Sequence, residues 1–202
     1  MLSTKLLAIC FVVLGTVTTA AAQAANPVVV METSMGTIKV ELFEQKAPIT
    51  VKNFLAYTDD KFYDGLIFHR VMGKENSDRD FMIQGGGFTP GLKKEKDTKP
   101  AIKNESTNGL SNVRGTIAMA RQPQPDTATS QFFINVGDNT ALDGAPGRPG
   151  YAVFGRVISG MDIVDKIKAV KTETRTVGRD MHENVPSEDI TIKSVRREEA
   201  KK

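Results

Sequence analysis

The sequence predicts a mainly β fold, a closed eight-stranded antiparallel β-barrel capped by two α-helices. Eight short segments are rich in apolar and β-branched residues or alternate apolar with polar residues, and two others show helical spacing. The chain also holds 17 glycines and 9 prolines, which supply turns. Many short strands with turn-rich connections favour a closed barrel over an alternating α/β sheet.

The first two strands are expected at residues 28–33 and 37–42. The second alternates apolar and polar side chains with a period of two, which is typical of a strand with one buried face. Ser34, Met35 and Gly36 lie between them as a turn, so the two segments are predicted to form a hairpin. The other six strands are predicted at 66–71, 81–84, 116–120, 131–135, 151–157 and 189–195.

Two segments have the spacing of short helices. Pro48 suits the first turn of a helix, where its missing N–H leaves nothing unsatisfied. Val51, Phe54 and Leu55 then fall on one face, which predicts a helix over residues 48–57. The second helix is indicated by the positions Met161, Val164, Ile167 and Lys168.

Residues 1–24 are predicted to be a secretory signal peptide. Lys5 precedes an almost wholly apolar run at 6–17, and small residues follow at 20–25, which is the order such peptides share. Cleavage after Ala24 is preferred, with cleavage after Ala22 as the alternative. The apolar run is shorter than the roughly 20 residues of a membrane anchor. The mature domain is then residues 25–202, with a charged tail at 196–202 that is expected to be frayed.

Composition and charge argue against several classes of function. The net charge is only +3 and forms no basic stripe, so no nucleic-acid partner is expected. Cys10 is the only cysteine, so the mature chain can form no disulfide. His69 and His182 have no carboxylates at metal-ligand spacing, so neither a metal nor another cofactor is expected. The glycine run that begins at Gly85 is more typical of a bulge than of a phosphate-binding loop.

Six motifs follow one another along the chain. They are Phe68-His69-Arg70, Phe81-Met82-Ile83-Gln84-Gly85-Gly86-Gly87-Phe88, Gly115-Thr116-Ile117-Ala118-Met119-Ala120-Arg121, Ser130-Gln131-Phe132-Phe133-Ile134-Asn135, Leu142-Asp143-Gly144 and Tyr151-Ala152-Val153-Phe154-Gly155-Arg156-Val157. The series resembles the cyclophilin family of peptidyl-prolyl isomerases, and the bacterial exported members in particular. The likeness extends from about residue 28 to residue 195.

The resemblance implies roles for the matched positions. Arg70 matches the catalytic arginine of the family. Arg121 stands where many members have Asn, and Tyr151 stands where eukaryotic members usually have His. The expected substrate-binding residues are Phe81, Met82, Gln84, Ala120, Arg121, Gln131, Phe133, Leu142 and Tyr151.

The residue types agree with those roles. Rotation about a peptide bond breaks no covalent bond, so it requires no nucleophile, metal or redox group. A guanidinium can hydrogen-bond to the prolyl nitrogen more strongly when that atom becomes pyramidal, which is differential binding of the transition state. Adjacent strand residues point to opposite faces. His69 is therefore expected to be structural and to face away from Arg70.

The chain departs from the family pattern in three places. Residues 71–80 form a longer, charged connection, either a plain solvated loop or a rim that screens substrates by charge. Ala141 aligns where cyclosporin-sensitive members have Trp, so weak cyclosporin binding is expected. The segment 145–150 lengthens the turn before Tyr151, so the alignment at that residue is left open.

Two functions follow from the same groove. The first is a prolyl isomerase that assists the folding of exported proteins, and the alternative is a holdase chaperone that binds unfolded chains. Proline-containing polypeptides are the expected partners, and a monomer without membrane contact after signal cleavage is expected. Bacterial relatives with such a signal are usually periplasmic, so the periplasm is the expected location, with full secretion left open.

Overall fold

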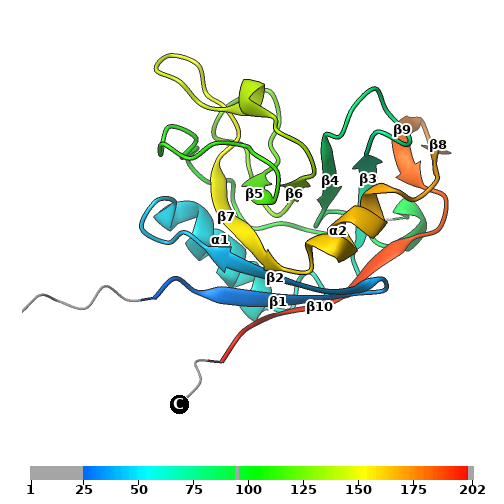
Figure 1. Cartoon of the computed structure of the whole chain (residues 1–202), viewed down its shortest axis with the longest axis horizontal. Helices are drawn as coiled ribbons and strands as arrows, with labels where there is room; N and C mark the ends of the chain where they lie inside the picture. Colours follow the sequence, from blue (N-terminus) through cyan, green and yellow to red (C-terminus); the bar gives the residue numbers. More distant parts are fainter. Residues whose placement is uncertain (1–24, 94–95, 200–202) are drawn as a thin grey trace, which may run out of the picture.

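The computed structural model describes residues 25–93 and 96–199. The predicted signal peptide and its cleavage site therefore lie outside the described residues, apart from Ala25. Figure 1 shows the strands wrapped into a barrel, with the two helices against different sides of it. In the part of the chain that the structure describes, no helix is long and apolar enough to cross a membrane.

Eight strands close into one barrel in the order β1-β10-β3-β4-β6-β5-β7-β2, and every neighbouring pair is antiparallel. This confirms the predicted architecture, and each predicted strand corresponds to one of the eight within a few residues. Closure leaves no free sheet edge in the barrel. The strands are β1 (Val28–Thr33), β2 (Gly36–Leu42), β3 (Ile67–Met72), β4 (Met82–Gly85), β5 (Thr116–Met119), β6 (Phe132–Asn135), β7 (Val153–Ser159) and β10 (Ile190–Arg197).

Both predicted helices are present, α1 (Pro48–Asp59) and α2 (Met161–Lys168). They complete the main core: Phe54 of α1 and Ile167 of α2 are fully buried in the same apolar cluster as inward-facing strand residues. Helix α1 runs two residues beyond the predicted end. Two short 3₁₀ helices, η1 (Pro90–Leu92) and η2 (Thr140–Leu142), interrupt the connections between strands.

A second, two-stranded sheet lies outside the barrel and is absent from the sequence-based assignment. Strands β8 (Thr172–Val177) and β9 (Asp180–Pro186) form this hairpin. Val185 is fully buried in a small cluster with Ile67 of β3 and Leu92, so the hairpin packs against the outer side of the barrel. Arg175 fixes its base by hydrogen bonds to the carbonyl oxygens of Pro186 and Ser187.

The prediction of a frayed tail over residues 196–202 is wrong for the first two of them. Strand β10 continues through Arg196 and Arg197, and both side chains form bidentate ion pairs. Arg196 binds Asp64 at 2.9 and 2.7 Å, and Arg197 binds Asp59 at 2.8 and 2.6 Å. The charges that suggested a solvated tail thus fasten the last strand to the loop after α1 and to the end of α1 itself.

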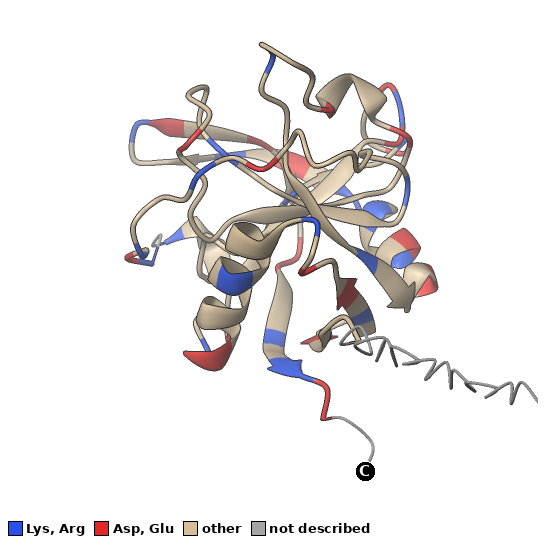
Figure 2. Ribbon diagram, turned by 90° about the vertical axis from the view of Figure 1, so that its left-hand side faces the viewer, with Lys and Arg blue, Asp and Glu red and all other residues tan. Residues whose placement is uncertain are grey.

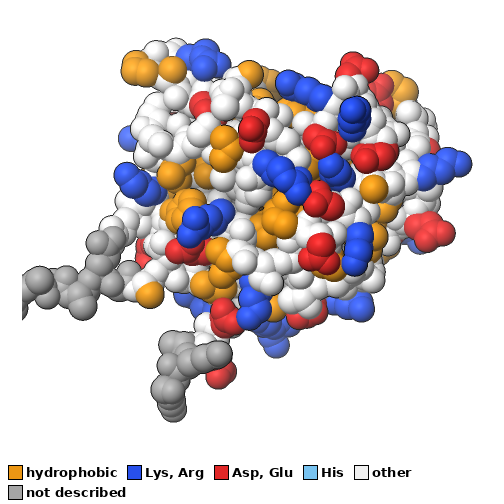
Figure 3. Space-filling model, viewed as in Figure 1, with side chains coloured by type: hydrophobic (Ala, Val, Ile, Leu, Met, Phe, Trp, Pro, Cys, Tyr) orange, Lys and Arg blue, Asp and Glu red, His pale blue; other side chains and the backbone are white. Residues whose placement is uncertain are grey.

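The surface carries charges of both signs. Basic and acidic residues are scattered along the ribbon in Figure 2 and are interspersed on the face shown in Figure 3. Many of them are paired across elements, as Lys168 with Asp80 and Arg114 with Asp165 are. Such interspersed charge is typical of a soluble globular surface.

Candidate active site

The register of three neighbouring strands determines where the first site residues lie. Arg70 of β3 stands opposite Gln84 of β4, and Gln84 stands opposite Phe133 of β6. Residues directly opposite one another in a ladder share a face of the sheet. Ala118 of β5 pairs with Phe133 and extends the row. The outer face of the barrel therefore carries a line of side chains that runs from a cation to an apolar patch.

The apolar patch is a cluster of its own, separate from the main core. Met82, Ala118, Phe133 and Val153 are buried in it, although they belong to strands whose opposite faces fill the barrel. The Tyr151 ring stands edge-on to the Phe133 ring, with centroids 5.7 Å apart. This second cluster forms an apolar floor on the outer side of the barrel.

A pocket of about 210 Å³ opens over this patch. It brings together every sequence-predicted site residue except Gln131. Its lining consists of Arg70, Phe81, Met82, Gln84, Ala120, Arg121, Phe133, Leu142 and Tyr151.

Gln131 lies beside the pocket, in an adjoining cavity of about 120 Å³ that also includes Gln84 and Ala120. The Gln84 side-chain amide donates a hydrogen bond of 2.9 Å to Oε1 of Gln131. A Cβ on Gly87 would come within 2.6 Å of Nε2 of Gln131, so a larger residue there would displace the Gln131 side chain. Gly87 thus leaves room for the Gln131 side chain that binds Gln84.

Arg70 differs from most arginines of the structure in its hydrogen bonding. Its residue is only partly exposed, yet among the described residues no side-chain hydrogen bond or ion pair engages its guanidinium. Five N–H donors are therefore available at the edge of the pocket. The other arginine of the lining differs, because Arg121 donates to the carbonyl oxygens of Gly150, Gln122, Pro123 and Pro149.

These hydrogen bonds show that Arg121 stabilises the wall of the pocket. Its guanidinium carbon lies 4.7 Å from the centre of the Tyr151 ring, within range of a cation–π contact. The same side chain fastens the loop at 145–150, whose alignment the sequence left open. Tyr151 is placed firmly in the wall as a result.

Sequence reasoning missed a network of buried amides behind the pocket. Asp143 accepts hydrogen bonds from the backbone and side-chain nitrogens of Asn112, at 2.7 and 2.9 Å. Asn112 also donates to the carbonyl oxygen of Tyr151, and Asn139 donates to that of Phe81 at 2.7 Å. The network therefore fixes the backbone of two pocket walls. Scattered Asn residues carry no pattern by which the sequence could have revealed it.

Hydrogen bonds set the charge of this network. Burial raises the pKa of Asp143, but the hydrogen bonds from Ser111 and Asn112 outweigh it and hold the pKa below its usual range. The carboxylate thus stays ionised and accepts all of these donors at neutral pH.

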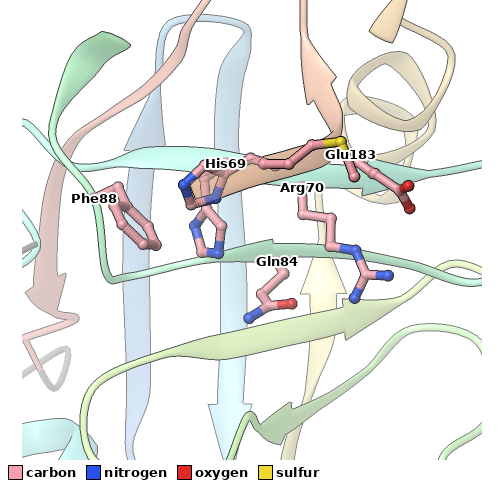
Figure 4. A pocket seen from close by; sticks show the side chains of 7 residues that line it. His69, Arg70, Gln84, Phe88 and Glu183 are labelled. Carbon is pink, nitrogen blue, oxygen red and sulfur yellow. The ribbon is translucent and has the colours of Figure 1, made fainter. Parts of the chain in front are cut away.

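The expectation that His69 faces away from Arg70 is wrong. The β3–β4 register shifts between Phe68 and Arg70, and such a bulge breaks the strict alternation of faces. His69 and Arg70 consequently line one cavity, of about 350 Å³, together with residues of the β8–β9 hairpin (Figure 4). Burial, with the nearby charges of His182 and Arg70, lowers the pKa of His69 to about 4. Its imidazole is therefore neutral at physiological pH.

The charged connection before β4 is anchored to α2. Asn76 donates to the carbonyl oxygens of Lys168 and Val170, and Asp80 pairs with Lys168 at 2.6 Å. Arg79 lies 5.3 Å from the centre of the Phe81 ring. The loop therefore borders the pocket, while its role in screening substrates stays a prediction. Among the described residues, no group of three or more His, Cys, Asp or Glu side chains is placed to hold a metal.

The fold and the cleft together define a class of protein: a β-barrel whose outer face offers a side-chain-sized apolar pocket with amides and one uncommitted cation at its edge. Residues 28–197 match the model of the family described as "Cyclophilin type peptidyl-prolyl cis-trans isomerase/CLD". The chain belongs to this family, and its activity is peptidyl-prolyl cis-trans isomerisation.

Named relatives agree with the family match. A peptidyl-prolyl cis-trans isomerase of Acinetobacter baylyi is 52% identical over 184 residues, which cover 91% of this chain and 92% of the relative. Peptidyl-prolyl cis-trans isomerase B of Escherichia coli is 52% identical and covers 83% of this chain and 97% of the relative.

Solved structures show the same fold. A cyclophilin-type isomerase from Cryptosporidium parvum superposes with a TM-score of 0.68 at 26% identity, covering 87% of this chain and 99% of that one. A second structure, obtained in the presence of the dipeptide Ala-Pro, also gives a TM-score of 0.68 and covers 86% of this chain and 99% of that one.

Proposed function

We propose that Arg70 is the catalytic residue and that the 210 Å³ pocket holds the proline whose preceding bond is rotated. The observation that carries this proposal is the uncommitted guanidinium on the wall of an apolar pocket. A guanidinium without a protein partner at the edge of an apolar pocket keeps its N–H donors available to a ligand.

The chemistry requires little more than this. The peptide C–N bond resists rotation by roughly 18–20 kcal/mol because the nitrogen lone pair is delocalised into the carbonyl group. Uncatalysed X–Pro isomerisation accordingly takes tens to hundreds of seconds. At the midpoint of the rotation the lone pair is localised on the prolyl nitrogen. A guanidinium N–H directed at that atom binds the twisted state better than the planar one and so lowers the barrier.

The rest of the cleft fixes the substrate. Met82, Phe133 and Leu142 contact the pyrrolidine ring and exclude water, so the electrostatic effect of Arg70 is screened less than in solution. Gln84 and Gln131 offer amides that bind substrate backbone without adding charge. The ring is held while the residue before it turns.

We further propose that the clients are exported proteins and that the enzyme works in the periplasm. The support is the sequence of residues 1–24, whose charged, apolar and small-residue order is that of a cleavable signal. The test is N-terminal sequencing of the protein recovered from a periplasmic extract. A chain that begins at Ala25, or at Gln23, supports export, and a chain that still begins at Met1 contradicts it.

Replacing Arg70 tests the catalytic proposal. Arg70→Ala removes the donor that acts on the twisted state, and kcat/KM for a proline-containing tetrapeptide is expected to fall about 10²- to 10³-fold. Peptide affinity, measured by calorimetry, is expected to change far less because the apolar pocket remains. Arg70→Lys keeps the charge but not the planar fork, and it should recover only part of the rate.

The matched control is Arg156→Ala. Arg156 is an exposed arginine of β7, paired with Glu41 and outside the lining of the pocket, so its removal should leave the rate unchanged. Normal catalysis by the Arg70→Ala protein contradicts the mechanism. If that variant is inactive in the peptide assay but fully effective in supporting folding in the cell, the holdase function replaces the isomerase function as the physiological one.

A further inference from the structure

A second cavity adjoins the proline pocket on the side of the hairpin. It measures about 350 Å³ and shares two walls with the pocket, Arg70 and Gln84. Its other lining residues are His69 and Phe88 from the barrel side and Met181, His182 and Glu183 from β9. Figure 4 shows Phe88 and Glu183 at opposite ends of the group, with Arg70 and Gln84 between them.

The walls of the cavity are held by ring contacts, burial and hydrogen bonds. The Phe88 ring stands edge-on to both imidazoles, 4.8 Å from His69 and 5.5 Å from His182. Strand β9 is held by the burial of Val185 and by Arg175, which also pairs with Asp189 at 3.1 Å. Asp189 in turn accepts a hydrogen bond from the backbone of Gly91. A hairpin fastened in this way presents a preformed wall.

The chemistry of that wall is specific. Glu183 contributes the single carboxylate of the lining, and among the described residues no hydrogen bond or ion pair engages its side chain. Beside it, Met181 is 66% exposed, although it is a large apolar side chain. A carboxylate next to an adaptable apolar surface suits a long side chain with an aliphatic stem and a cationic head.

We propose that this cavity is a substrate subsite that receives a Lys or Arg side chain near the isomerised proline. The proposal rests on the proposed function, because it takes the adjoining pocket as the proline site. The two pockets share walls, and an extended chain advances about 3.3 Å per residue, so the basic residue lies within about three positions of the proline. Glu183 is the one carboxylate of the lining, so its charge places the ammonium or guanidinium head at the hairpin wall of the cavity.

The test compares matched peptides. Isomerisation is measured for peptides that carry Lys, Ala or Glu in turn at each of the three positions on either side of one proline. At one of these positions the wild-type protein should favour Lys over Ala in kcat/KM by about two- to fivefold, the range of a solvent-exposed ion pair. The preference should shrink as salt is raised to 1 M, because screening weakens such pairs.

Variants then assign the preference to one carboxylate. Glu183→Gln is expected to bring the Lys-to-Ala ratio close to one, and Glu183→Lys is expected to favour the Glu peptide. Glu188→Gln is the chemically matched control: Glu188 is also exposed but lies outside the lining of this cavity, so it should keep the wild-type ratio. Using the ratio corrects for any general loss of activity in a variant.

The outcomes separate the two proposals. If peptides are isomerised but no position favours Lys, or if Glu183→Gln keeps the preference, the subsite is refuted and the proline site stands. If Arg70→Ala is fully active on the Ala peptide, the proposed function itself fails. Calorimetry with the Lys and Ala peptides supplies a readout without catalysis: equal affinities at low salt at every position also refute the subsite.

Discussion

At the scale of single residues, the contrast between the arginines explains the site. Arg121 has its donors satisfied by four carbonyl oxygens, whereas Arg70 has no such partner among the described residues. Both line the same pocket, so position alone does not distinguish them. The difference in hydrogen bonding supports the proposal that Arg70 acts on the substrate, while Arg121 holds the wall of the pocket.

His69 makes stability depend on pH. Its pKa is about 4 in the folded protein, chiefly because of burial, against 6.5 for the unperturbed group. Between these values the unfolded chain binds a proton that the folded chain does not. The free energy of unfolding is therefore expected to fall as the pH is lowered from about 6.5 to about 4, by about 3 kcal/mol in total, and this contribution should level off below pH 4.

Urea unfolding from pH 4 to 7 measures this effect. His69→Asn should flatten the curve in that window, while His182→Asn should keep most of the slope, because burial is the largest cause of the lowered pKa and the charge of His182 a smaller one. If the first variant does not fold, NMR titration of the wild-type imidazole provides the same information. A midpoint near 6.5 for His69 is inconsistent with its burial and would remove the predicted slope.

At the scale of elements, the site depends on segments that contribute no catalytic group. The buried amides of residues 112, 135 and 139 connect the loop before β5, the end of β6 and η2. They hold the backbone of Phe81 and Tyr151, which form walls of the pocket. The shape of the pocket therefore depends on these hydrogen bonds, which lie behind its walls.

Removing Asn112 tests that dependence. Asn112→Ala removes the side-chain donor to Asp143 and to the carbonyl oxygen of Tyr151, at an expected cost of about 1–3 kcal/mol in unfolding free energy, while Asp143 keeps its hydrogen bonds from Ser111 and from the backbone of residue 112. Because the walls shift while Arg70 stays, KM should rise more than kcat falls. Urea unfolding and steady-state kinetics measure the two effects.

Asn76→Ala is the control for this variant. It removes an amide that ties the loop before β4 to α2, so it should also lower stability but leave KM near the wild-type value. A fall in kcat alone for Asn112→Ala, with KM unchanged, contradicts a positioning role for the network.

The elements also show how far sequence reasoning extends. Period-two alternation and helical spacing located the eight barrel strands and both helices, because those elements bury one face in a common core. The hairpin β8–β9 was not predicted from the sequence, because its residues are largely polar and exposed and only Val185 and Pro186 are buried. A strand that packs outside the core carries no strong periodic signal.

The candidate site was likewise predictable only in part. Its lining was predictable because the motifs are contiguous in sequence and are brought together by the barrel register. The second cavity was not, since it requires a bulge at His69 and a hairpin more than 100 positions further along the chain. Neither a bulge nor a long-range contact has a local signature.

At the scale of the whole molecule, closure of the barrel makes the first and the last strand of the described chain neighbours. Strand β1 pairs with β2 on one side and with β10 on the other. The contacts begin at Asn26, which donates to Glu41, and at Pro27, whose carbonyl oxygen accepts from the backbone of Leu42. The cleft lies on the side of the barrel formed by β3, β4, β6 and β5, which depends on this closure for its curvature.

Truncation tests this view of the fold. A chain that starts at Ala25 is expected to unfold at the same guanidinium concentration as the full chain, because it keeps every contact of β1. A chain that starts at Ser34 lacks β1 and should not fold cooperatively. A cooperative transition of unchanged midpoint in the shorter chain contradicts a closed barrel.

The most direct test of the central claim separates rotation from binding. NMR exchange spectroscopy of a labelled proline peptide, at saturating enzyme, reports the rate at which the bound peptide interconverts between cis and trans. Arg70→Ala should slow this on-enzyme rate at least about 100-fold while the peptide still occupies the pocket beside Phe133. An unchanged interconversion rate in the bound peptide would show that Arg70 does not stabilise the twisted bond.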